Sequence, residues 1–261
     1  MNRSLAIACL QMPVLLRKED RNIEMVLRAI DGLSIDSPHV ICLPELFTTG
    51  FDYPYLKKRE PGITGEILDR LAEKASARGA YILAGTLPER TNGGVYNTLF
   101  VLDPSGHRVA AYRKIHLFPL MGEDEFFSPG EETLVLHTSL ARIGIAVCYD
   151  IRFPLLFRRM AVEGAEIIFV PAQFPEARID HWDILLKARA IENQLFVAGV
   201  NRIGDDRTGR FPGHTCIIDP LGKLKAGGNE EEGWVVTTID IGEVEGIRQA
   251  LPSFIYENKE I

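Results

Sequence analysis

A cysteine at the end of a short apolar run is the first candidate for chemistry in this sequence. Cys148 follows Ile143–Val147, which has the character of a strand buried on both faces. Pro154 can begin the next helix, predicted at Leu155–Val162. The thiol is therefore expected at a strand–turn–helix junction, where a nearby helix N-terminus would favour the thiolate. An isolated cysteine in such a place is more often inert and buried, so its role depends on the rest of the chain.

Two further polar residues follow apolar strands and make chemical sense beside a thiol. Glu45 comes directly after Val-Ile-Cys-Leu-Pro, and Lys114 lies in Tyr-Arg-Lys-Ile-His-Leu-Phe. A carboxylate whose pKa is raised by burial can take the proton of a thiol that attacks a carbonyl group. A fixed ammonium and the backbone N–H after the nucleophile can stabilise the resulting oxyanion. Taken alone, Glu45 could equally be solvated, and Arg113 and His116 compete with Lys114 for the functional role.

Composition and charge limit the class of protein. The chain has 261 residues, of which 46% are hydrophobic and 25% are charged, as in globular proteins. This length allows one large α/β domain, expected over residues 1–261 with a tail after about residue 250. The 36 acidic residues outnumber the 29 lysines and arginines, giving a net charge of −7, and no basic block stands out. We therefore expect neither a nucleic-acid partner nor a membrane partner.

Cysteine and histidine spacing bears on compartment and metal binding. The first ten residues hold one positive charge and an apolar run too short for a signal peptide, and we expect them to form a strand. No apolar stretch reaches membrane-spanning length. The four cysteines, which form neither a close pair nor a zinc-type spacing, are Cys9, Cys42, Cys148 and Cys216. This pattern suits a reducing compartment, so a cytoplasmic location is expected. The six histidines form no ligand cluster, and we expect no metal and no organic cofactor.

Apolar periodicity predicts an alternation of strands and helices in the first third of the chain. The predicted strands are Leu5–Leu10, Val40–Leu43 and Tyr81–Thr86. The predicted helices are Asn22–Leu33 and Thr64–Ala77, the second of which begins at a threonine that can act as its N-cap. A strand–helix–strand–helix–strand order indicates a sheet that is at least partly parallel.

The rest of the chain predicts two similar halves. Strands Val95–Leu102 and Val109–Arg113 are joined by Asp-Pro-Ser-Gly, a strong turn signal, and the same Asp-Pro-x-Gly pattern recurs after Cys216. The elements expected around the second hairpin are strand Glu166–Val170, helix Asp180–Asn193, strand Leu195–Asn201, strand Val235–Ile239 and helix Val244–Ala250. Each half then has a parallel α/β part followed by a hairpin, and two such sheets packed face to face give an α-β-β-α sandwich.

Three motifs, in order along the chain, resemble the signatures of the nitrilase (carbon–nitrogen hydrolase) superfamily. They are Leu43–Phe47, Tyr112–Phe118 and Cys148–Pro154, and the resemblance extends over nearly the whole chain. It implies the α-β-β-α sandwich, with Glu45 as general base, Lys114 as oxyanion stabiliser and Cys148 as nucleophile. It also implies assembly into a homodimer or a larger homo-oligomer.

The resemblance further implies a second active-site glutamate between the lysine and the cysteine. The segment Gly122–Gly130 offers Glu123 and Glu125. Counting back from its Pro-Gly pair, Glu123 matches the amidase-like members better, and Glu125 is the alternative. One of the two is expected to be a solvated loop residue.

Within the superfamily, Pro171–Trp182 and Lys187–Gln194 resemble the omega-amidase group, whose members hydrolyse the terminal amide of 2-oxo acids such as 2-oxoglutaramate and 2-oxosuccinamate. Phe174 could line an acyl pocket, and an arginine could bind a substrate carboxylate through two hydrogen bonds. The residues expected at the substrate are Tyr149, Arg152, Phe174 and Arg178.

Other residues in these segments have structural interpretations. Arg189 and Glu192 are spaced i to i+3 and are expected to form a pair on one helix face. His181 and Trp182 are expected to be packing residues.

Several alternatives remain open from the sequence. The same site could hydrolyse an N-carbamoyl amine, deaminated glutathione, an aliphatic amide or a nitrile, of which the nitrile fits least. A thiol-based redox protein is a remote alternative, because no resolving cysteine lies near Cys148 in the sequence. A catalytically inactive binding protein is disfavoured by the presence of all three residue types.

Overall fold

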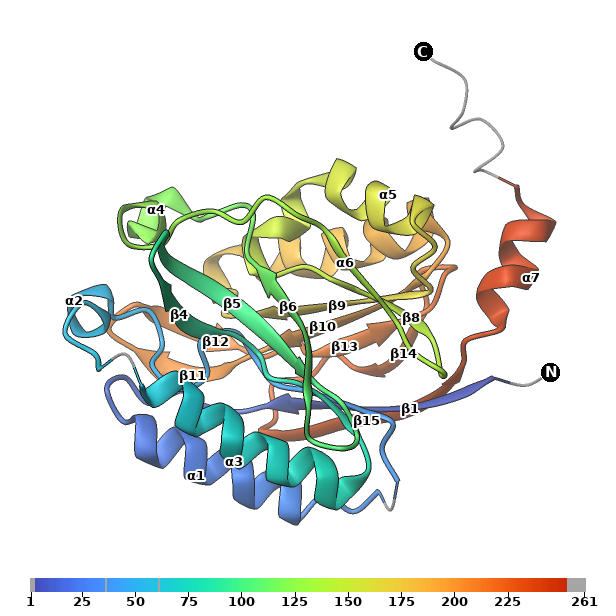
Figure 1. The fold of residues 1–261 in the computed structure, drawn as a ribbon. Helices are drawn as coiled ribbons and strands as arrows, with labels where there is room; N and C mark the ends of the chain where they lie inside the picture. The colour runs from blue at the N-terminus through green and yellow to red at the C-terminus, as the bar shows by residue number, and fades with distance from the viewer. Residues whose placement is uncertain (1–2, 36, 61, 253–261) are drawn as a thin grey trace.

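Two sheets pack face to face, and helices cover their outer sides (Figure 1). The computed structural model describes residues 3–35, 37–60 and 62–252; most of the predicted tail, residues 253–261, lies outside the described part. In the first sheet the strand order is β15 (Gly233–Asp240), β1 (Ser4–Gln11), β2 (Val40–Cys42), β3 (Tyr81–Leu83), β5 (Gly94–Leu102) and β4 (Leu87–Thr91), with β6 (Arg108–Arg113) also paired to β5. In the second sheet the order is β14 (Leu224–Gly227), β13 (Cys216–Ile218), β10 (Phe196–Asn201), β9 (Ile167–Ala172), β8 (Arg142–Ile145) and β7 (Leu134–His137).

The longer helices form the outer layers of the sandwich. The first sheet is covered by α1 (Glu19–Asp31) and α3 (Ile63–Arg78), and the second by α5 (Pro154–Val162) and α6 (Ile179–Asn193). The shorter elements are α2 (Tyr53–Leu56), α4 (Glu123–Phe126), α7 (Glu243–Ala250), the 3-10 helices η1 (Pro119–Met121), η2 (Cys148–Arg152) and η3 (Glu176–Arg178), and the ribbon of β11 (Ile203–Asp206) and β12 (Gly209–Pro212). None of the described helices has the length and apolar character needed to cross a membrane.

The alternation of side chains along β1 shows why the chain forms layers. Leu5, Ile7 and Cys9 belong to the core between the two sheets, whereas Ala8 and Leu10 belong to the core between the first sheet and its helices. Successive residues of a strand point to opposite faces, so an apolar strand can fill both cores at once. Each fully buried large apolar side chain contributes about 1.5–3 kcal/mol to this arrangement.

The predicted two halves are present. Strands β1, β2 and β3 pair in parallel, as do β8, β9 and β10. The two Asp-Pro-x-Gly turns are also built alike. Asp103 Oδ1 accepts backbone N–H groups at 2.8 and 2.9 Å, and Asp219 Oδ1 accepts two at 2.9 Å. Gly106 and Gly222 have φ angles of 83° and 79°, in the left-handed region that glycine adopts without steric cost.

Some details differ from the sequence-based predictions. Strand β3 ends at Leu83 because Gly85 turns the chain with φ of 53°; a Cβ there would lie 2.0 Å from the Pro44 carbonyl oxygen. Thr64 is not the N-cap of α3, since Gly62 takes that position. The Thr64 hydroxyl instead donates to the Pro88 carbonyl at 2.7 Å, which ties the helix to β4. Strands β4, β7, β11 and β12 were not predicted.

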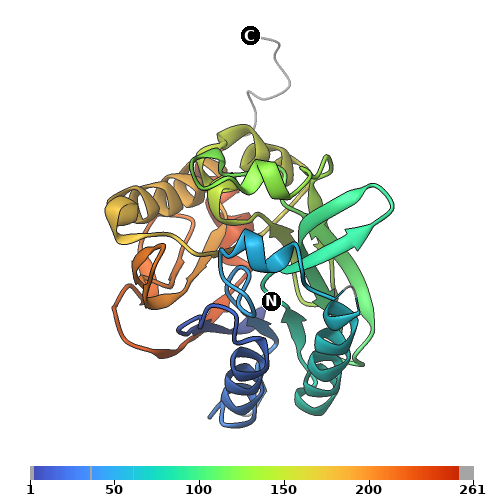
Figure 2. The ribbon, with the colours of Figure 1, turned by 90° about the vertical axis from the view of Figure 1, so that its left-hand side faces the viewer.

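One end of the sandwich collects the three predicted motifs. Figure 2 looks onto this end, where α2 and α4 lie in front of the sheets. Strand β2 is followed here by Glu45, β6 by Lys114, and β8 by η2, which begins at Cys148. Segments that are distant in the sequence thus meet where strands of both sheets end.

Candidate active site

The nucleophile candidate lies in a tight turn. Cys148 begins η2, three residues beyond the end of β8, and its φ of 47° places it in the left-handed region. For a residue other than glycine this conformation costs about 1–3 kcal/mol and persists only where the surroundings enforce it. Asp150 does so: its backbone N–H donates to Val147 O at 3.0 Å, and its Oδ2 accepts the Val147 N–H at 2.8 Å.

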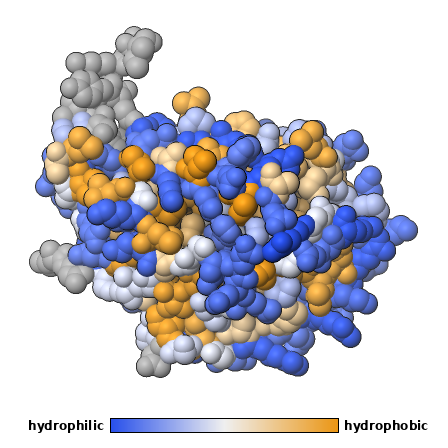
Figure 3. Space-filling view, turned by 180° about the vertical axis from the view of Figure 1, so that it is seen from behind, coloured by the Kyte–Doolittle hydropathy of each residue, from blue (hydrophilic) through white to orange (hydrophobic). Residues whose placement is uncertain are grey.

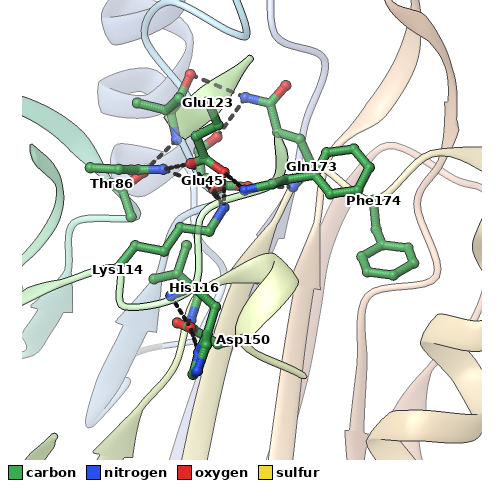
Figure 4. Close-up of polar contacts among 12 residues, drawn as sticks. Glu45, Thr86, Lys114, His116, Glu123, Asp150, Gln173 and Phe174 are labelled. Carbon is green, nitrogen blue, oxygen red and sulfur yellow. Dashed lines mark hydrogen bonds and ion pairs between the residues drawn. The ribbon is translucent and has the colours of Figure 1, made fainter. Parts of the chain in front are cut away.

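The Asp150 carboxylate also joins this turn to the Lys114 segment. It is fully buried and accepts the Tyr112 hydroxyl at 2.8 Å and the His116 backbone N–H at 3.0 Å. The His116 ring contributes a third contact, Nδ1 to Oδ1 at 2.7 Å (Figure 4). The same ring stacks on Phe153 with ring centroids 3.5 Å apart. The residues on either side of Lys114 are therefore fixed to the cysteine turn by one carboxylate.

Glu45 is held by residues from both sheets. Its Oε2 accepts the Gln173 backbone N–H at 3.1 Å, and the Gln173 side-chain amide donates to the Glu45 carbonyl at 2.7 Å. Arg202 orients that amide, because its guanidinium donates to Gln173 Oε1 at 3.0 Å. After Glu45 the chain is anchored by Leu46, whose N–H donates to the Thr86 hydroxyl at 2.9 Å. The carboxylate thus has little freedom to rotate.

Lys114 lies between two glutamates. Its Nζ is 2.9 Å from Glu45 Oε1, 2.9 Å from Glu123 Oε1 and 2.8 Å from Glu123 Oε2 (Figure 4). All three side chains are at most 1% exposed. The amide of Asn97 donates to both carboxylates at 2.9 Å, and the Phe118 N–H donates to Glu123 at 2.7 Å. The cluster thus combines one cation, two carboxylates and neutral donors.

Burial and mutual charge shift the pKa values in this cluster. Burial raises the pKa of Glu45, Lys114 opposes that shift, and Glu123 adds to it. Burial alone would lower the pKa of Lys114, but Glu123 and Glu45 outweigh it, so its pKa lies well above the usual value. The pKa of Cys148 is raised by burial and then by Glu45. The expected stabilisation of the thiolate by a helix N-terminus is therefore wrong, since desolvation dominates at this site.

A narrow pocket leads to Cys148. About 30 Å³ of it is open to water-sized molecules. Most of the exposed lining is apolar, with two arginines among the lining residues. The residues around the pocket are Phe51, Tyr53, Lys114, Phe118, Met121, Glu123, Cys148, Tyr149, Arg152, Gln173, Phe174, Pro175 and Arg178. Within the described residues, no three His, Cys, Asp or Glu side chains are placed to hold a metal ion.

Comparisons with known proteins agree with this geometry. The model of the carbon–nitrogen hydrolase family matches residues 6–249. The chain belongs to the carbon–nitrogen hydrolase family. It is 39% identical to the 2-oxoglutaramate amidase of Bacillus subtilis over 95% of each chain, and 30% identical to the human omega-amidase NIT2, over 99% of this chain and 96% of that protein.

A solved structure confirms the fold of this hydrolase. XC1258 from Xanthomonas campestris, a superfamily member with an arsenic adduct in its active site, superposes with a TM-score of 0.90. The two sequences are 31% identical, and the match covers 99% of this chain and 98% of the other. The predictions of an α-β-β-α sandwich, of the superfamily and of a carbon–nitrogen hydrolase are thus confirmed.

The structure of the hydrolase brings most of the predicted site residues together. Cys148, Lys114 and Glu123 line one pocket, and Glu45 lies directly behind them against Lys114. Glu125, the alternative to Glu123, is exposed and lies outside the cluster. The four predicted substrate residues all line the pocket: Tyr149, Arg152, Phe174 and Arg178.

Several neighbouring residues have other functions in the fold. Arg113 donates to Glu89 at 2.8 Å, away from the pocket. Arg189 and Glu192 form the expected pair at 2.7 Å, and Arg189 also donates to the Ile151 carbonyl at 2.9 Å beneath the cysteine turn. Trp182 is buried as expected.

One of the packing predictions is wrong. His181 is exposed, and its Nδ1 lies 3.3 Å from an Arg152 nitrogen. It lies in the first turn of α6 beside the pocket and does not pack in the core, because Trp182 takes the buried position next to it.

Sequence reasoning missed the residues that support the site from a distance. Asn97 lies in the middle of β5, and Arg202 follows β10; both are buried polar residues within apolar strand regions. A polar residue in an otherwise apolar strand was the available signal, since burial without a partner is costly.

Proposed function

We propose that this hydrolase is an omega-amidase that releases ammonia from 2-oxoglutaramate or 2-oxosuccinamate. The observation that carries the proposal is a single pocket lined by a thiol, an ammonium, a carboxylate and two arginines. The thiol, ammonium and carboxylate suit attack on the amide of the substrate, and the arginines suit the carboxylate at the other end of a 2-oxo acid amide. The relatives named as 2-oxoglutaramate amidase and omega-amidase support the same substrate class.

In the first half-reaction, Cys148 is the nucleophile and Glu45 is the general base. Glu45 takes the thiol proton as sulfur bonds to the amide carbon, and the oxyanion is stabilised by Lys114 and the backbone N–H of Tyr149. The same proton then passes to the amide nitrogen. The carbon–nitrogen bond breaks, ammonia leaves, and a thioester remains on Cys148.

In the second half-reaction water replaces ammonia. Glu45 takes a proton from the water as the water oxygen bonds to the thioester carbon, and the carbon–sulfur bond then breaks. The proton returns to the sulfur, so the acid is released and the free thiol is restored. Glu45 is suited to both steps because burial raises its pKa toward the working pH.

Glu123 has a supporting role in this proposal. Both of its oxygens lie within 2.9 Å of Lys114 Nζ, so it holds the ammonium on the pocket side. As the counter-ion of Lys114, it lets Glu45 accept a proton without leaving the lysine unpaired.

The arginines are proposed to bind the substrate carboxylate. Among the described residues, neither Arg152 nor Arg178 forms an ion pair with a carboxylate. The Arg152 guanidinium lies 5.5 Å from the Phe174 ring centroid, and that of Arg178 lies 5.4 Å from the Phe118 ring centroid. Aromatic faces thus hold both cations. They leave the donors of Arg178 for a ligand, and those of Arg152 apart from the nitrogen that lies against His181.

Ammonia release from four amides tests this function. We expect the wild type to hydrolyse 2-oxoglutaramate and 2-oxosuccinamate much faster than glutamine or propionamide. Arg152→Met and Arg178→Met are compared with it, and the arginine that binds the carboxylate should lose about 10- to 100-fold in kcat/KM toward the 2-oxo acid amides. Activity toward propionamide, which has no carboxylate, should change little.

A matched control distinguishes the loss of an arginine in the pocket from the loss of an arginine elsewhere on the surface. Arg159→Met removes an exposed arginine from α5, where it pairs with Glu163 at 3.2 Å, and should leave all four rates unchanged. If propionamide is the fastest substrate, or if both pocket variants keep the wild-type preference, the omega-amidase proposal is wrong. The carbon–nitrogen hydrolase assignment would remain.

We also propose that the protein works as a homodimer or larger homo-oligomer in the cytoplasm. Apolar side chains on the outer helices support assembly: Leu155 is 81% exposed and Ile184 is 64% exposed. The face shown in Figure 3 carries several hydrophobic groups among hydrophilic ones. All four cysteines are free and buried, which supports a reducing compartment.

Light scattering after size exclusion tests the oligomer. The wild type should have at least twice the chain mass, and Leu155→Asp should lower it because a charge would be buried at the contact. Val109→Asp, at an exposed position of β6, is the control. A wild type of single-chain mass at micromolar concentration would contradict assembly.

A further inference from the structure

Asn97 occupies an unusual position between the two glutamates. It lies on β5 and is fully buried, and its side-chain nitrogen is 2.9 Å from Glu45 Oε1 and 2.9 Å from Glu123 Oε1. Lys114 Nζ is 2.9 Å from the same two oxygens. Two nitrogens and two oxygens therefore alternate around a closed ring, in which each oxygen faces one charged donor and one neutral donor.

The orientation of the Asn97 amide is determined by this ring. An amide nitrogen has two hydrogens, and here each points to a different carboxylate. The amide oxygen is buried and has no hydrogen-bond partner among the residues that the structure describes. Turning the amide over would bring that oxygen against both carboxylates and would remove both donors. The fold thus accepts an unsatisfied carbonyl to keep the nitrogen between the glutamates.

The backbone of Asn97 adds a second link to the cluster. Its carbonyl accepts the Lys114 backbone N–H at 2.9 Å, just beyond the β5–β6 pairing. One residue therefore fixes the start of the lysine side chain and both of the carboxylates that the lysine binds. Asn97 does not line the substrate pocket, so it has no direct contact with a ligand there.

We propose that Asn97 is a positioning residue that keeps Glu45 ionised and aligned for proton transfer with Cys148. This inference rests on the proposed roles of Glu45 and Cys148. The titratable groups acting on Glu45 are Lys114, which directly follows β6, and Glu123, Cys148 and Tyr53, which come from α4, η2 and α2. Asn97 stabilises the charged form of Glu45 without adding charge, whereas a cation in its place would compete with Lys114.

The test uses Asn97→Ala, which removes the donors, and Asn97→Asp, which keeps the shape but replaces the donor nitrogen by an acceptor. The readouts are kcat and KM with the best amide substrate, and the pH dependence of iodoacetamide alkylation at Cys148, followed by mass spectrometry. We expect kcat to fall about 10- to 100-fold with little change in KM. The acid limb of the alkylation profile should move to higher pH in both variants, and further in Asn97→Asp because its carboxylate repels Glu45.

Thr98→Val is the matched control. The neighbouring Thr98 donates a partly buried hydrogen bond to Glu89 at 2.9 Å on the other side of β5, so this variant disturbs the same strand without touching the ring. It should keep the wild-type kcat and pH profile. Circular dichroism and thermal unfolding identify any variant that does not fold. In that case Asn97→Ser, which keeps one hydrogen-bond donor, is tested in place of the unfolded variant.

The outcomes distinguish this inference from the proposed function. If folded Asn97 variants keep the wild-type alkylation profile and kcat, Asn97 has no positioning role even though the Glu–Lys–Cys site stands. If kcat falls but the profile does not move, its effect is only structural, and the proposal is also wrong. If wild-type Cys148 is inert both to iodoacetamide and to every amide tested, the proposed function itself fails.

Discussion

Replacing Cys148 by alanine should abolish ammonia release while leaving the folded protein almost as stable as the wild type. Without sulfur no thioester can form, and loss of a nucleophile of this kind lowers kcat by at least about 10⁴-fold. The substitution removes one buried atom and keeps the Cβ, so the free energy of unfolding should change by about 1 kcal/mol or less. Ammonia release and urea unfolding, both measured at one protein concentration, check the two halves of this prediction.

Cys216→Ala is the control for this experiment. Cys216 is also buried, but it lies on β13, away from the pocket. Its replacement by alanine removes the same sulfur atom from the core. It should show a similar small loss of stability and full activity. Wild-type protein quenched during turnover should carry an acyl group on Cys148, detectable by mass spectrometry. Turnover of the alanine variant at a few per cent of wild type would refute the nucleophile assignment.

The parallel core of the fold could be predicted because its signal is local. Strands buried on both faces are continuous apolar runs, as β1 and β9 illustrate, and the helices between them keep a helical period. The two Asp-Pro-x-Gly turns likewise carry their geometry in four residues. By contrast, β11 and β12 have mixed burial, and their pairing depends on contacts that no local pattern specifies.

The candidate site could be predicted in part for a related reason. Glu45, Lys114 and Cys148 occur in recognisable motifs, but the choice of Glu123 over Glu125 depends on the short helix α4, which turns only the first toward Lys114. The thiol pKa was predicted in the wrong direction because spacing reveals a nearby helix but not the degree of burial. Asn97 was missed because its partners are 52 and 26 residues away.

Replacing Lys114 by methionine should destabilise the protein strongly, and the loss should depend on pH. In the wild type its ammonium lies within 2.9 Å of both Glu45 and Glu123, and none of the three is more than 1% exposed. Methionine fills much of the same space but leaves two buried carboxylates without a cation. Breaking a buried pair in this way costs about 3–5 kcal/mol near neutral pH. Loss of the oxyanion donor should also lower kcat by about 10²- to 10³-fold.

The sign of the pH dependence follows from Glu45. In Lys114→Met, burial and the nearby Glu123 hold the pKa of Glu45 above its unfolded value of about 4.3, and no ammonium opposes them. Below the unfolded pKa, Glu45 is neutral in both the folded and the unfolded state, so the stability deficit is smallest there. As the pH rises from the unfolded pKa to the folded pKa, the folded state must ionise a buried group, so the deficit grows, and it levels off above the folded pKa.

Urea unfolding of wild type and variant between pH 4 and pH 8 measures this difference. Lys74→Met is the matched control, because Lys74 pairs with Asp31 at 2.6 Å on the surface, where Asp31 is 60% exposed. An exposed pair contributes only about 0.2–1 kcal/mol, and its loss should depend little on pH in this range. A Lys114→Met deficit as small as that of the control, or one that stays constant with pH, would show that the buried lysine does not hold Glu45 in its charged form.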